Sequence, residues 1–388
     1  MVIFMLTGAT STAGHEGFIT YMRKLRISLL MVVLALIAIG IVMIYSSTAI
    51  YAWEKFGDSA YFLKRQILFV AGGALFSLFM MSIDYRALSK YSKALVLLSL
   101  FLLLLLHVPG MSREISGAKR WFRLFGFSFQ PSEFASLAVI TYTASFLADK
   151  GLKRVEYFSF SFMPAMIVLA IVSVLVLAQP DLGTAVALSL VVFIMLFSAG
   201  VSFRHILYVV IAGAPFLYLL IFRVPYRRAR ILAFLNPWAD PLGSGFQLIQ
   251  SQVALGSGGL FGRGLGKSLQ KLFYLPAGHT DFIFSVIGEE LGFFAVSGIV
   301  FLFVLFFVYG CKVIKSAQDA FGTYLSLGIV LLISLKAVIN IGVSTAMFPT
   351  KGLPLPFISY GGSSLIFDMM GVGLLLNVAR FSENPHET

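Results

Sequence analysis

Ten long apolar segments constrain this chain more than any other feature of its sequence. A helix that spans a bilayer needs about 20 mostly apolar residues, and the candidate segments run over 27–47, 66–83, 94–109, 132–148, 162–179, 182–200, 203–222, 283–310, 321–347 and 362–380. None of them alternates polar and apolar residues with the period of two that a transmembrane barrel requires. The sequence therefore predicts an all-α, polytopic membrane protein with about ten transmembrane helices.

The composition excludes an ordinary soluble domain. Hydrophobic residues make up 59% of the chain and charged residues 12%, whereas soluble domains contain about 45–50% apolar and about 25% charged residues. The single cysteine, Cys311, excludes an internal disulfide and a zinc cluster built from cysteines.

Basic residues near the start of the chain predict where the membrane domain begins and which way it faces. Residues 1–21 are mixed and polar and precede Arg23, Lys24 and Arg26, an order opposite to that of a cleavable signal peptide. We expect 1–21 to be a non-essential extension and 22–388 to form a single transmembrane domain. Short loops rich in Lys and Arg stay in the cytoplasm, so both termini are expected to be cytoplasmic.

The loops on the expected outer face carry more positive charge than topology explains. The longest, an extracytoplasmic loop over about 223–281 before the eighth helix, contains Arg223, Arg227, Arg228, Arg230, Arg263, Lys267 and Lys271. The loop between the third and fourth helices adds Arg113, Lys119, Arg120 and Arg123. Arg and Lys bind phosphate oxygens, so this charge predicts an anionic ligand, and basic pockets of this kind also bind membrane lipid headgroups. The alternative is that individual side chains only snorkel to the interface.

The segment 275–290, LPAGHTDFIFSVIGEE, places ionisable groups at the mouth of an apolar segment. Such groups at membrane depth usually face a bundle interior or a wet cavity and mark a functional site. Asp281 is therefore a candidate proton acceptor, with His279 beside it. Alternatively, Asp281 or Thr280 only caps the next helix, and the two roles differ chemically because Asn caps as well as Asp but cannot act as a base.

Two neighbouring features have structural alternatives. Glu289 could face the same cavity as Asp281, while Glu290 is expected to pair elsewhere, and either could be satisfied by a Lys, an Arg or a hydroxyl group. The glycine-rich run 256–268 is not a nucleotide-binding loop, because Phe261 stands where such a loop needs Gly and no strand precedes it. The run predicts a flexible backbone that could approach a headgroup closely.

Polar residues also gather where other helices meet the outer face. Glu133 lies at the start of the fourth helix, and Asp181 lies in a tight turn, where it is a turn or capping residue by default. Ser363 belongs to a run of small residues that opens the last helix after two prolines. Irregular backbone at this depth is tolerated only when it is buried in protein or lines a cavity, so this segment is a candidate cavity wall. Alternatively, the small residues only allow close contact between helices.

Five motifs occur in order along the chain: GAKRWF…QPSEF, QPDLGT, FLNPWADPLGSGFQLIQSQVALGSGGLFGRGLG, LPAGHTDFIFSVIGEELG and LPLPFISYGGSS. Together they resemble the SEDS family (shape, elongation, division and sporulation), and the resemblance covers about residues 24–380. The stretch GLGKSLQKLFYLPAGHTDFIFSVIGEELG is more similar to the division member of this family than to its elongation member.

The resemblance implies a ten-helix peptidoglycan glycosyltransferase in the cytoplasmic membrane of a bacterium, enriched at the division septum. Such an enzyme joins lipid II units into glycan strands and works with a class B penicillin-binding protein, the transpeptidase that crosslinks them, and with other divisome membrane proteins. By motif, Asp281 corresponds to the family's proposed catalytic residue. Lys119 and Glu133 fall in a second motif that is expected to line the same cavity, and Asp181 matches the QPD motif. Many members have Glu where this chain has Ala277. If that Glu assists catalysis in other members, this chain must catalyse the reaction without it.

The chemistry of this reaction agrees with the residues. An α-linked donor that yields a β-linkage undergoes one inversion, and Asp281 is predicted to take the proton of the acceptor hydroxyl as general base. The pyrophosphate leaving group needs positive charge. The predicted substrate-binding residues are Lys119, Arg120, Glu133, Asp181, Arg227, Arg228, Arg263, Lys267, His279 and Ser363. A divalent cation, Mg²⁺ or Mn²⁺, could assist, but no dense carboxylate cluster indicates a tightly held metal.

Two other classes of function stay open. A lipid II flippase would suit ten spans, broken helices and intramembrane carboxylates, but no inverted sequence repeat supports it and the polar residues gather on the outer side. A non-catalytic divisome scaffold would explain the fold but not the outer charge or Asp281. No nucleic-acid partner is expected.

Overall fold

The computed structural model describes residues 12–108, 111–115, 118–124, 127–150, 162–271 and 275–383. Each of the ten predicted apolar segments forms a helix, so the predicted all-α membrane fold is confirmed. The bundle helices are α1 (Thr12–Phe56), α2 (Tyr61–Ser82), α3 (Ala87–Leu105), α4 (Pro131–Lys150), α5 (Met163–Ala178), α6 (Leu182–Ser198), α7 (Phe203–Phe222), α10 (Ile283–Ser316), α11 (Ala320–Ser344) and α12 (Gly362–Phe381).

Length and apolar composition allow many of these helices to cross a bilayer. Six of the described helices meet both criteria, namely α1, α2, α3, α10, α11 and α12. Three shorter apolar helices, α5, α6 and the first part of α7, lie beside them. α4 packs among α3, α6 and α11 in the bundle. The chain is therefore a multi-pass membrane protein.

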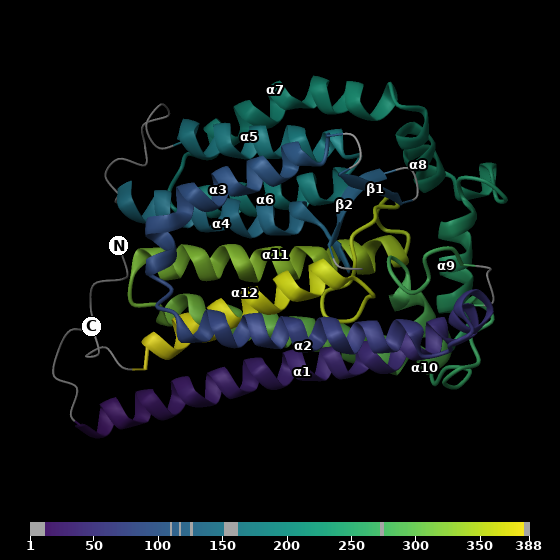
Figure 1. Cartoon of the computed structure of the whole chain (residues 1–388), viewed down its shortest axis with the longest axis horizontal. Helices are drawn as coiled ribbons and strands as arrows, with labels where there is room; N and C mark the ends of the chain where they lie inside the picture. The colour runs from purple at the N-terminus through teal and green to yellow at the C-terminus, as the bar shows by residue number, and fades with distance from the viewer. Residues whose placement is uncertain are drawn as a thin grey trace.

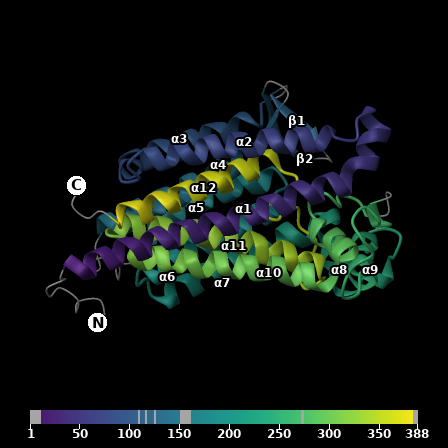
Figure 2. The same cartoon turned by 90° about the horizontal axis from the view of Figure 1, so that it is seen from below.

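The helices run side by side and leave their connections at two ends of the molecule (Figure 1). One end holds the start of α1, the end of α12 and the turns α2–α3 and α10–α11 (Figures 1 and 2). The other end holds the strands, α8 and α9. The described parts of the segments that the sequence assigns to the outer face lie at this second end, here called the loop end.

A small antiparallel sheet at the loop end is absent from the sequence-based prediction. β1 (Ser112–Ile115), β2 (Ala118–Leu124) and β3 (Phe127–Phe129) pair in that order. These strands are short, so their alternation gives a weak signal beside the long apolar runs. β2 contacts α4 and β3 contacts α12, and the sheet thereby brings Arg120 and Trp121 to the end of the bundle.

The long loop before α10 contains two helices, α8 (Pro225–Leu235) and α9 (Phe246–Ser257), with the 3₁₀ turn Pro237–Ala239 between them. Proline suits the first turn of α8, because an amide hydrogen at this position would have no acceptor within the helix. Proline lacks this hydrogen, so no hydrogen bond is lost. α9 packs against α10 and α11, and its Ser251 hydroxyl donates to the carbonyl oxygen of Ser344 at 2.7 Å. The loop is therefore folded onto the bundle.

The glycine-rich run after α9 inserts its backbone into a break in α10. Gly292 at the break has φ 78°. Next to it, the amide of Phe293 donates to Gly259 O and that of Gly264 donates to Glu290 O, both at 2.9 Å. A β-carbon on Gly262 would lie only 2.2 Å from Glu290 O. The close backbone approach predicted for this run is therefore made to α10, within the protein.

Two glycines of this region allow a matched test of the contact between α9 and α10. A β-carbon on Gly258 would lie 1.9 Å from the carbonyl oxygen of Gly288, whereas one on Gly256 would meet nothing within 4 Å. We expect Gly258→Ala to lower the free energy of unfolding by about 1–3 kcal/mol, because overpacking forces the two backbones apart. Gly256→Ala should leave it unchanged or raise it by up to about 1 kcal/mol. Thermal unfolding in one detergent measures both, and equal melting temperatures would contradict the contact.

Candidate functional site

A cavity of about 670 Å³, called the chamber below, opens at the loop end of the bundle. Its walls come from α1, α2, the sheet, α8, the starts of α4, α6 and α12, the loop before α10 and the loop between α11 and α12. The residues predicted from sequence that line it are Arg120, Glu133, His279, Asp281 and Ser363. Folding therefore joins five of the eleven predicted site residues in one space.

The loop before α10 holds Asp281 at the chamber wall through its backbone. The amides of Thr280 and Asp281 both donate to Ala277 O at 3.1 Å, and Ala277 itself has φ 58°. Asn340 on α11 donates its side-chain amide to Asp281 O at 2.9 Å. The cap of α10 is Phe282, without a side-chain capping bond. The structure therefore does not assign Asp281 the capping role that the sequence left open.

Burial is the main influence on the Asp281 carboxyl. It raises the pKa to about 6, while the charges of Arg230 and Arg120 oppose this shift and that of Asp181 adds to it. A carboxyl with a pKa near neutral pH is suited to accept and return a proton. Burial also lowers the pKa of His279 to about 4, so this imidazole is neutral at pH 7.

His279 belongs to an aromatic wall that it forms with Tyr51, Phe62 and Tyr360. Its ring centroid lies 6.1 Å from that of Tyr51, 5.4 Å from Phe62 and 6.1 Å from Tyr360. The amide of Tyr360 donates to His279 O at 3.0 Å. His279 therefore contributes shape to the chamber beside Asp281 rather than a second charge.

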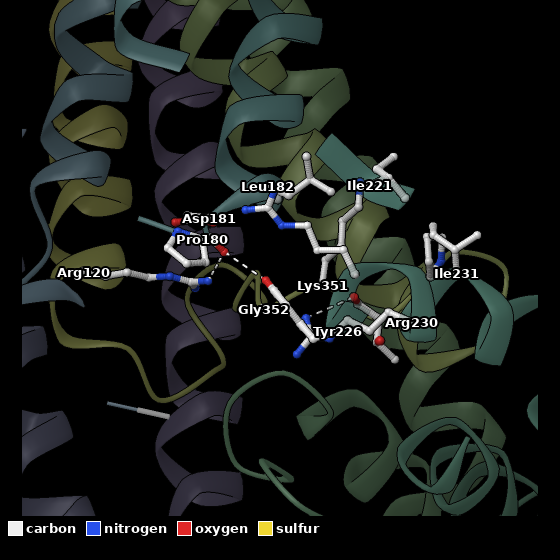
Figure 3. A pocket seen from close by; sticks show the side chains of 14 residues that line it. Arg120, Pro180, Asp181, Leu182, Ile221, Tyr226, Arg230, Ile231, Lys351 and Gly352 are labelled. Carbon is white, nitrogen blue, oxygen red and sulfur yellow. Dashed lines mark hydrogen bonds between the residues drawn. The ribbon is translucent and has the colours of Figure 1, made fainter. Parts of the chain in front are cut away.

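Arg120 is held by two backbone carbonyl groups. Its guanidinium donates to Gln179 O at 2.9 Å, in the turn between α5 and α6. It also donates to Pro180 O in the same turn (Figure 3). A β-carbon on Gly352 would lie 3.4 Å from the Asp281 carboxylate and 4.0 Å from the Arg120 guanidinium. Both charged groups therefore approach the same point of the chamber.

A smaller pocket of about 40 Å³, called the annex below, adjoins the chamber and shares Arg120, Arg230 and Gly352 with it (Figure 3). Arg227 and Lys351 also line the annex. Arg227 is buried at 8% exposure and donates to a carbonyl group at the end of α5. The annex thus gathers cationic side chains from β2, α8 and the loop before α12 around a small space.

Asp181 lies on the annex and caps α6. Its carboxylate accepts from the Thr184 amide at 3.3 Å and from the Thr184 hydroxyl at 2.9 Å. Burial raises its pKa, against the charge of Arg120. The role expected by default for this residue is confirmed, and the cap fixes the turn that holds Arg120.

Glu133 belongs to a buried ion triad. The Lys336 ammonium group lies 2.6 Å from the Glu133 carboxylate and 2.9 Å from that of Asp368, and all three side chains are almost excluded from solvent. A shared counter-ion offsets the cost of burying the two carboxylates. Glu133 thus borders the chamber while it ties α4 to α11 and α12.

Three more residues of the predicted set lie in three different surroundings. The Ser363 hydroxyl donates to Ser128 O at 2.9 Å and so ties the start of α12 to the sheet. Lys119 lies in β2, with its side chain outside the described part of the structure. Arg228 is exposed on α8 and lines neither pocket. No structural contact of these residues tests substrate binding, which stays a prediction.

Arg263 and Lys267 lie in the glycine-rich run, away from the chamber lining. Arg263 contacts the Glu289 carboxylate at 3.4 Å, and Lys271 contacts that of Glu290 at 3.1 Å. Glu289 also accepts from the Leu269 amide at 3.0 Å. Both glutamates therefore have structural partners, and Glu289 is not among the residues that line the chamber.

Four cationic residues line these pockets but are missing from the predicted set: Lys55, Arg65, Arg230 and Lys351. The charge excess of the long outer loop already pointed to Arg230. Lys55 and Arg65 flank the short turn between α1 and α2, where two basic residues give no signal of their own. Only folding places that turn against the loop before α10.

The donor groups do not fit a metal ion held by the protein. The described residues contain no group of three or more His, Cys, Asp and Glu side chains that could bind one. Besides Asp281, the carboxylates that line the two pockets are Asp181, which caps α6, and Glu133, which pairs with Lys336.

Fold and site define a class of protein: a polytopic membrane protein with a cation-rich chamber at one end of its bundle and a buried carboxylate in the chamber wall. The family profile for FtsW, RodA and SpoVE, described as "Cell cycle protein", matches residues 26–384. The chain belongs to this family, the SEDS family, as its motifs predicted.

Curated relatives cover most of the chain. It is 48% identical to the probable peptidoglycan glycosyltransferase FtsW of Geobacter metallireducens, over 90% of this chain and 93% of the relative. It is 43% identical to the stage V sporulation protein E of Bacillus subtilis, over 91% of this chain and 96% of the relative. Within the family, the predicted likeness to FtsW is confirmed.

Solved structures share the fold. A chain of a peptidoglycan synthase complex, described for its coordination of polymerization and crosslinking, superposes with a TM-score of 0.75 at 33% identity, over 93% of this chain and 98% of that chain. The rod shape determining protein RodA of Thermus thermophilus gives a TM-score of 0.67 at 30% identity, over 91% and 96%.

The raised pKa of Asp281 predicts how its replacement changes stability with pH. Above about pH 6 the carboxylate is charged in the folded and the unfolded protein, and its burial destabilises the fold. This penalty vanishes as the pH falls towards the unfolded value of 3.8. We therefore expect Asp281→Asn to raise the free energy of unfolding by on the order of 2–3 kcal/mol at pH 8, and by much less at pH 4.5. Melting temperatures at both pH values measure the difference, and a gain that does not depend on pH would contradict the assignment.

Proposed function

We propose that the protein is an inverting peptidoglycan glycosyltransferase that polymerises lipid II into glycan strands. The observation that carries the proposal is the Asp281 carboxylate, which is buried in the chamber wall beside Arg120 and Arg230 and does not cap a helix. Relatives named as probable peptidoglycan glycosyltransferases support the reaction class.

In the proposed step, the 4-hydroxyl oxygen of the acceptor N-acetylglucosamine attacks C1 of the donor N-acetylmuramic acid from the face opposite its pyrophosphate. The hydroxyl proton passes to Asp281 as the new bond between O4 and C1 forms. The bond between C1 and the pyrophosphate oxygen breaks, and its electron pair leaves with the polyprenyl pyrophosphate. Arg120 and Arg230 stabilise the negative charge that develops there. Asp281 then returns its proton to water.

The proposal places the chamber on the outer face of the bacterial cytoplasmic membrane and both termini in the cytoplasm, because the basic end of α1 lies opposite the loop end. It includes enrichment at the division septum. A class B penicillin-binding protein is the proposed partner, supported by the likeness to a chain of a complex that coordinates polymerization and crosslinking; other divisome membrane proteins are included. Mg²⁺ or Mn²⁺ enters the proposal only as a counter-ion that the substrate pyrophosphate would bring.

Replacement of the proposed base tests the reaction. Because an amide cannot accept the proton, Asp281→Asn should lower the rate of glycan polymerisation by about 10²–10⁴-fold. In the wild type the rate should rise with pH through about 6, as Asp281 becomes ionised. Polymer formed from purified lipid II by the protein reconstituted with its transpeptidase gives both results.

Asp240→Asn is the matched control. Asp240 lies in the exposed part of the same loop, and its carboxylate accepts from the Ser244 amide at 2.7 Å, a bond that Asn also makes. This variant should polymerise lipid II like the wild type. Full activity of a stably folded Asp281→Asn would remove the general-base role. If neither protein made polymer while lipid II crossed the bilayer, the flippase function would replace the proposed one.

A further inference from the structure

Two buried side chains hold the backbone of the loop that carries Asp281. The Ser359 hydroxyl donates to Thr280 O at 2.6 Å, and the Asn340 side-chain amide donates to Asp281 O at 2.9 Å. Ser359 is 3% exposed and Asn340 1%. Neither is among the described residues that line the chamber. Two neighbouring carbonyl groups of the loop are therefore fixed from inside the protein, behind the chamber wall.

Each of these side chains also holds the loop before α12. The same Asn340 nitrogen donates to Leu353 O at 2.7 Å, and the Ser359 hydroxyl oxygen accepts from the Leu355 amide at 2.8 Å. Carbonyl oxygens only accept hydrogen bonds, so the Asn340 atom between its two carbonyl groups must be the amide nitrogen. Asn340 and Ser359 therefore fasten the loop before α10 to the loop before α12.

The two fastened loops approach each other most closely at the Asp281 carboxylate. Gly352 precedes Leu353, and a β-carbon on Gly352 would lie 3.4 Å from that carboxylate. Since one nitrogen binds both Asp281 O and Leu353 O, it limits how far the two loops can move apart. The bonds of Asn340 therefore control how closely the backbone of Gly352 covers the carboxylate.

Asn340 lies on a helix that is packed in the centre of the bundle. Lys336, one turn earlier on the same face of α11, forms the buried ion triad with Glu133 and Asp368. A site that is supported from a packed helix is held more precisely than one that is supported from a loop. α11 therefore gives the irregular chain around Asp281 a rigid support.

We propose that Asn340 and Ser359 are positioning residues, which hold the Asp281 carboxylate in the orientation and the shielding from water that glycosyl transfer needs. The inference rests on the proposed function. Both residues act through the backbone of Asp281 and its neighbour, and neither contacts the reacting atoms. A displacement of about 1 Å at a reacting group can lower a rate by about 10²-fold, so the loss of these bonds should slow the reaction.

Asn377 provides a matched control at the opposite end of the bundle. It is 0% exposed, and its side-chain amide donates to Met80 O at 2.5 Å and to Ile83 O. In both asparagines, Oδ1 has no partner among the described residues. Leu resembles Asn in size and has no donor, so Asn340→Leu and Asn377→Leu each leave two buried carbonyl groups unpaired. Both variants should lower the melting temperature, but only the first should affect Asp281.

Polymerisation of lipid II by the protein reconstituted with its transpeptidase tests the rate. We expect Asn340→Leu to lower kcat by about 10–100-fold and to leave KM within about threefold of the wild type, because the base moves while the substrate contacts remain. Ser359→Ala should show a smaller loss of the same kind, and it decides the test if Asn340→Leu does not fold. Asn377→Leu should keep the wild-type kcat and KM.

The ionisation of Asp281 provides a measurement that a merely structural role would not change. The charged groups that act on it belong to β2, α8 and the turn before α6, and its neighbour His279 is neutral at pH 7: Arg120, Arg230 and Asp181. The substitution of Asn340 alters none of them. A loosened loop admits water, so the pKa of Asp281 should fall from about 6. The acid limb of the pH–rate profile should then move to lower pH by about one unit or more.

Melting temperatures test the same shielding without the reaction. In the wild-type background, Asp281→Asn should raise the melting temperature more at pH 8 than at pH 4.5, because burial of the carboxylate is costly. A carboxylate that water reaches has little such cost. The extra gain at pH 8 should therefore fall to about half or less in the Asn340→Leu or Ser359→Ala background. It should persist in the Asn377→Leu background.

Three results would overturn the positioning role: Asn340→Leu and Ser359→Ala keep the kcat and pH profile of Asn377→Leu, they raise KM with kcat unchanged, or they leave the gain from Asp281→Asn undiminished. A wild type that makes no polymer would instead refute the proposed function, and the melting temperatures would still decide whether Asn340 and Ser359 shield Asp281. The two failures are therefore distinguishable.

Discussion

A carboxylate taken out of water is costly unless an opposite charge or hydrogen bonds compensate it, and this constraint organises the loop end of the protein. Glu133 and Asp368 share Lys336, while Glu289 and Glu290 are held by the run that follows α9. Asp281 is different. Its carboxyl is buried against arginines that lie near it without an ion pair among the described residues, so its pKa is raised to about 6. The same cost that makes the other carboxylates structural leaves this one able to exchange a proton.

Irregular backbone is the second condition for the chamber. Non-helical chain at membrane depth survives only where protein buries it or where it lines a cavity, and three such loops meet here. Two of them contain a residue other than glycine with positive φ: Ala277 at 58° and Phe357 at 66°. Backbone in such conformations persists only where its surroundings hold it and is concentrated at functional sites. The bonds from Asn340 and Arg120 to neighbouring carbonyl groups supply that support.

The described residues show which parts of the site could be predicted from sequence. The sequence predicts Asp281 as a site residue because an acidic residue at the mouth of an apolar segment is rare and costly. This signal can be seen without knowing which residues surround Asp281 in the fold. Lys55 and Arg65 were not found, because a pair of basic residues beside a short turn is ordinary in a membrane protein. Arg263 had the same local signal as Arg230, yet one contacts Glu289 and the other lines the chamber. Charge count alone cannot separate them.

The sequence by itself determined the class of fold through its long apolar segments and their lack of a two-residue period. In a bilayer the backbone N–H and C=O groups must form their hydrogen bonds within the protein, which leaves few possible folds. The order of the motifs likewise determined the family. Tertiary structure alone decided which of the outer charges meet. The chamber joins α1, α2, β2, α8 and the loops before α10 and α12, segments that lie hundreds of residues apart at the extremes. Their contacts depend on how ten helices pack, and no local pattern of residues encodes the distance between two loops that the bundle brings together.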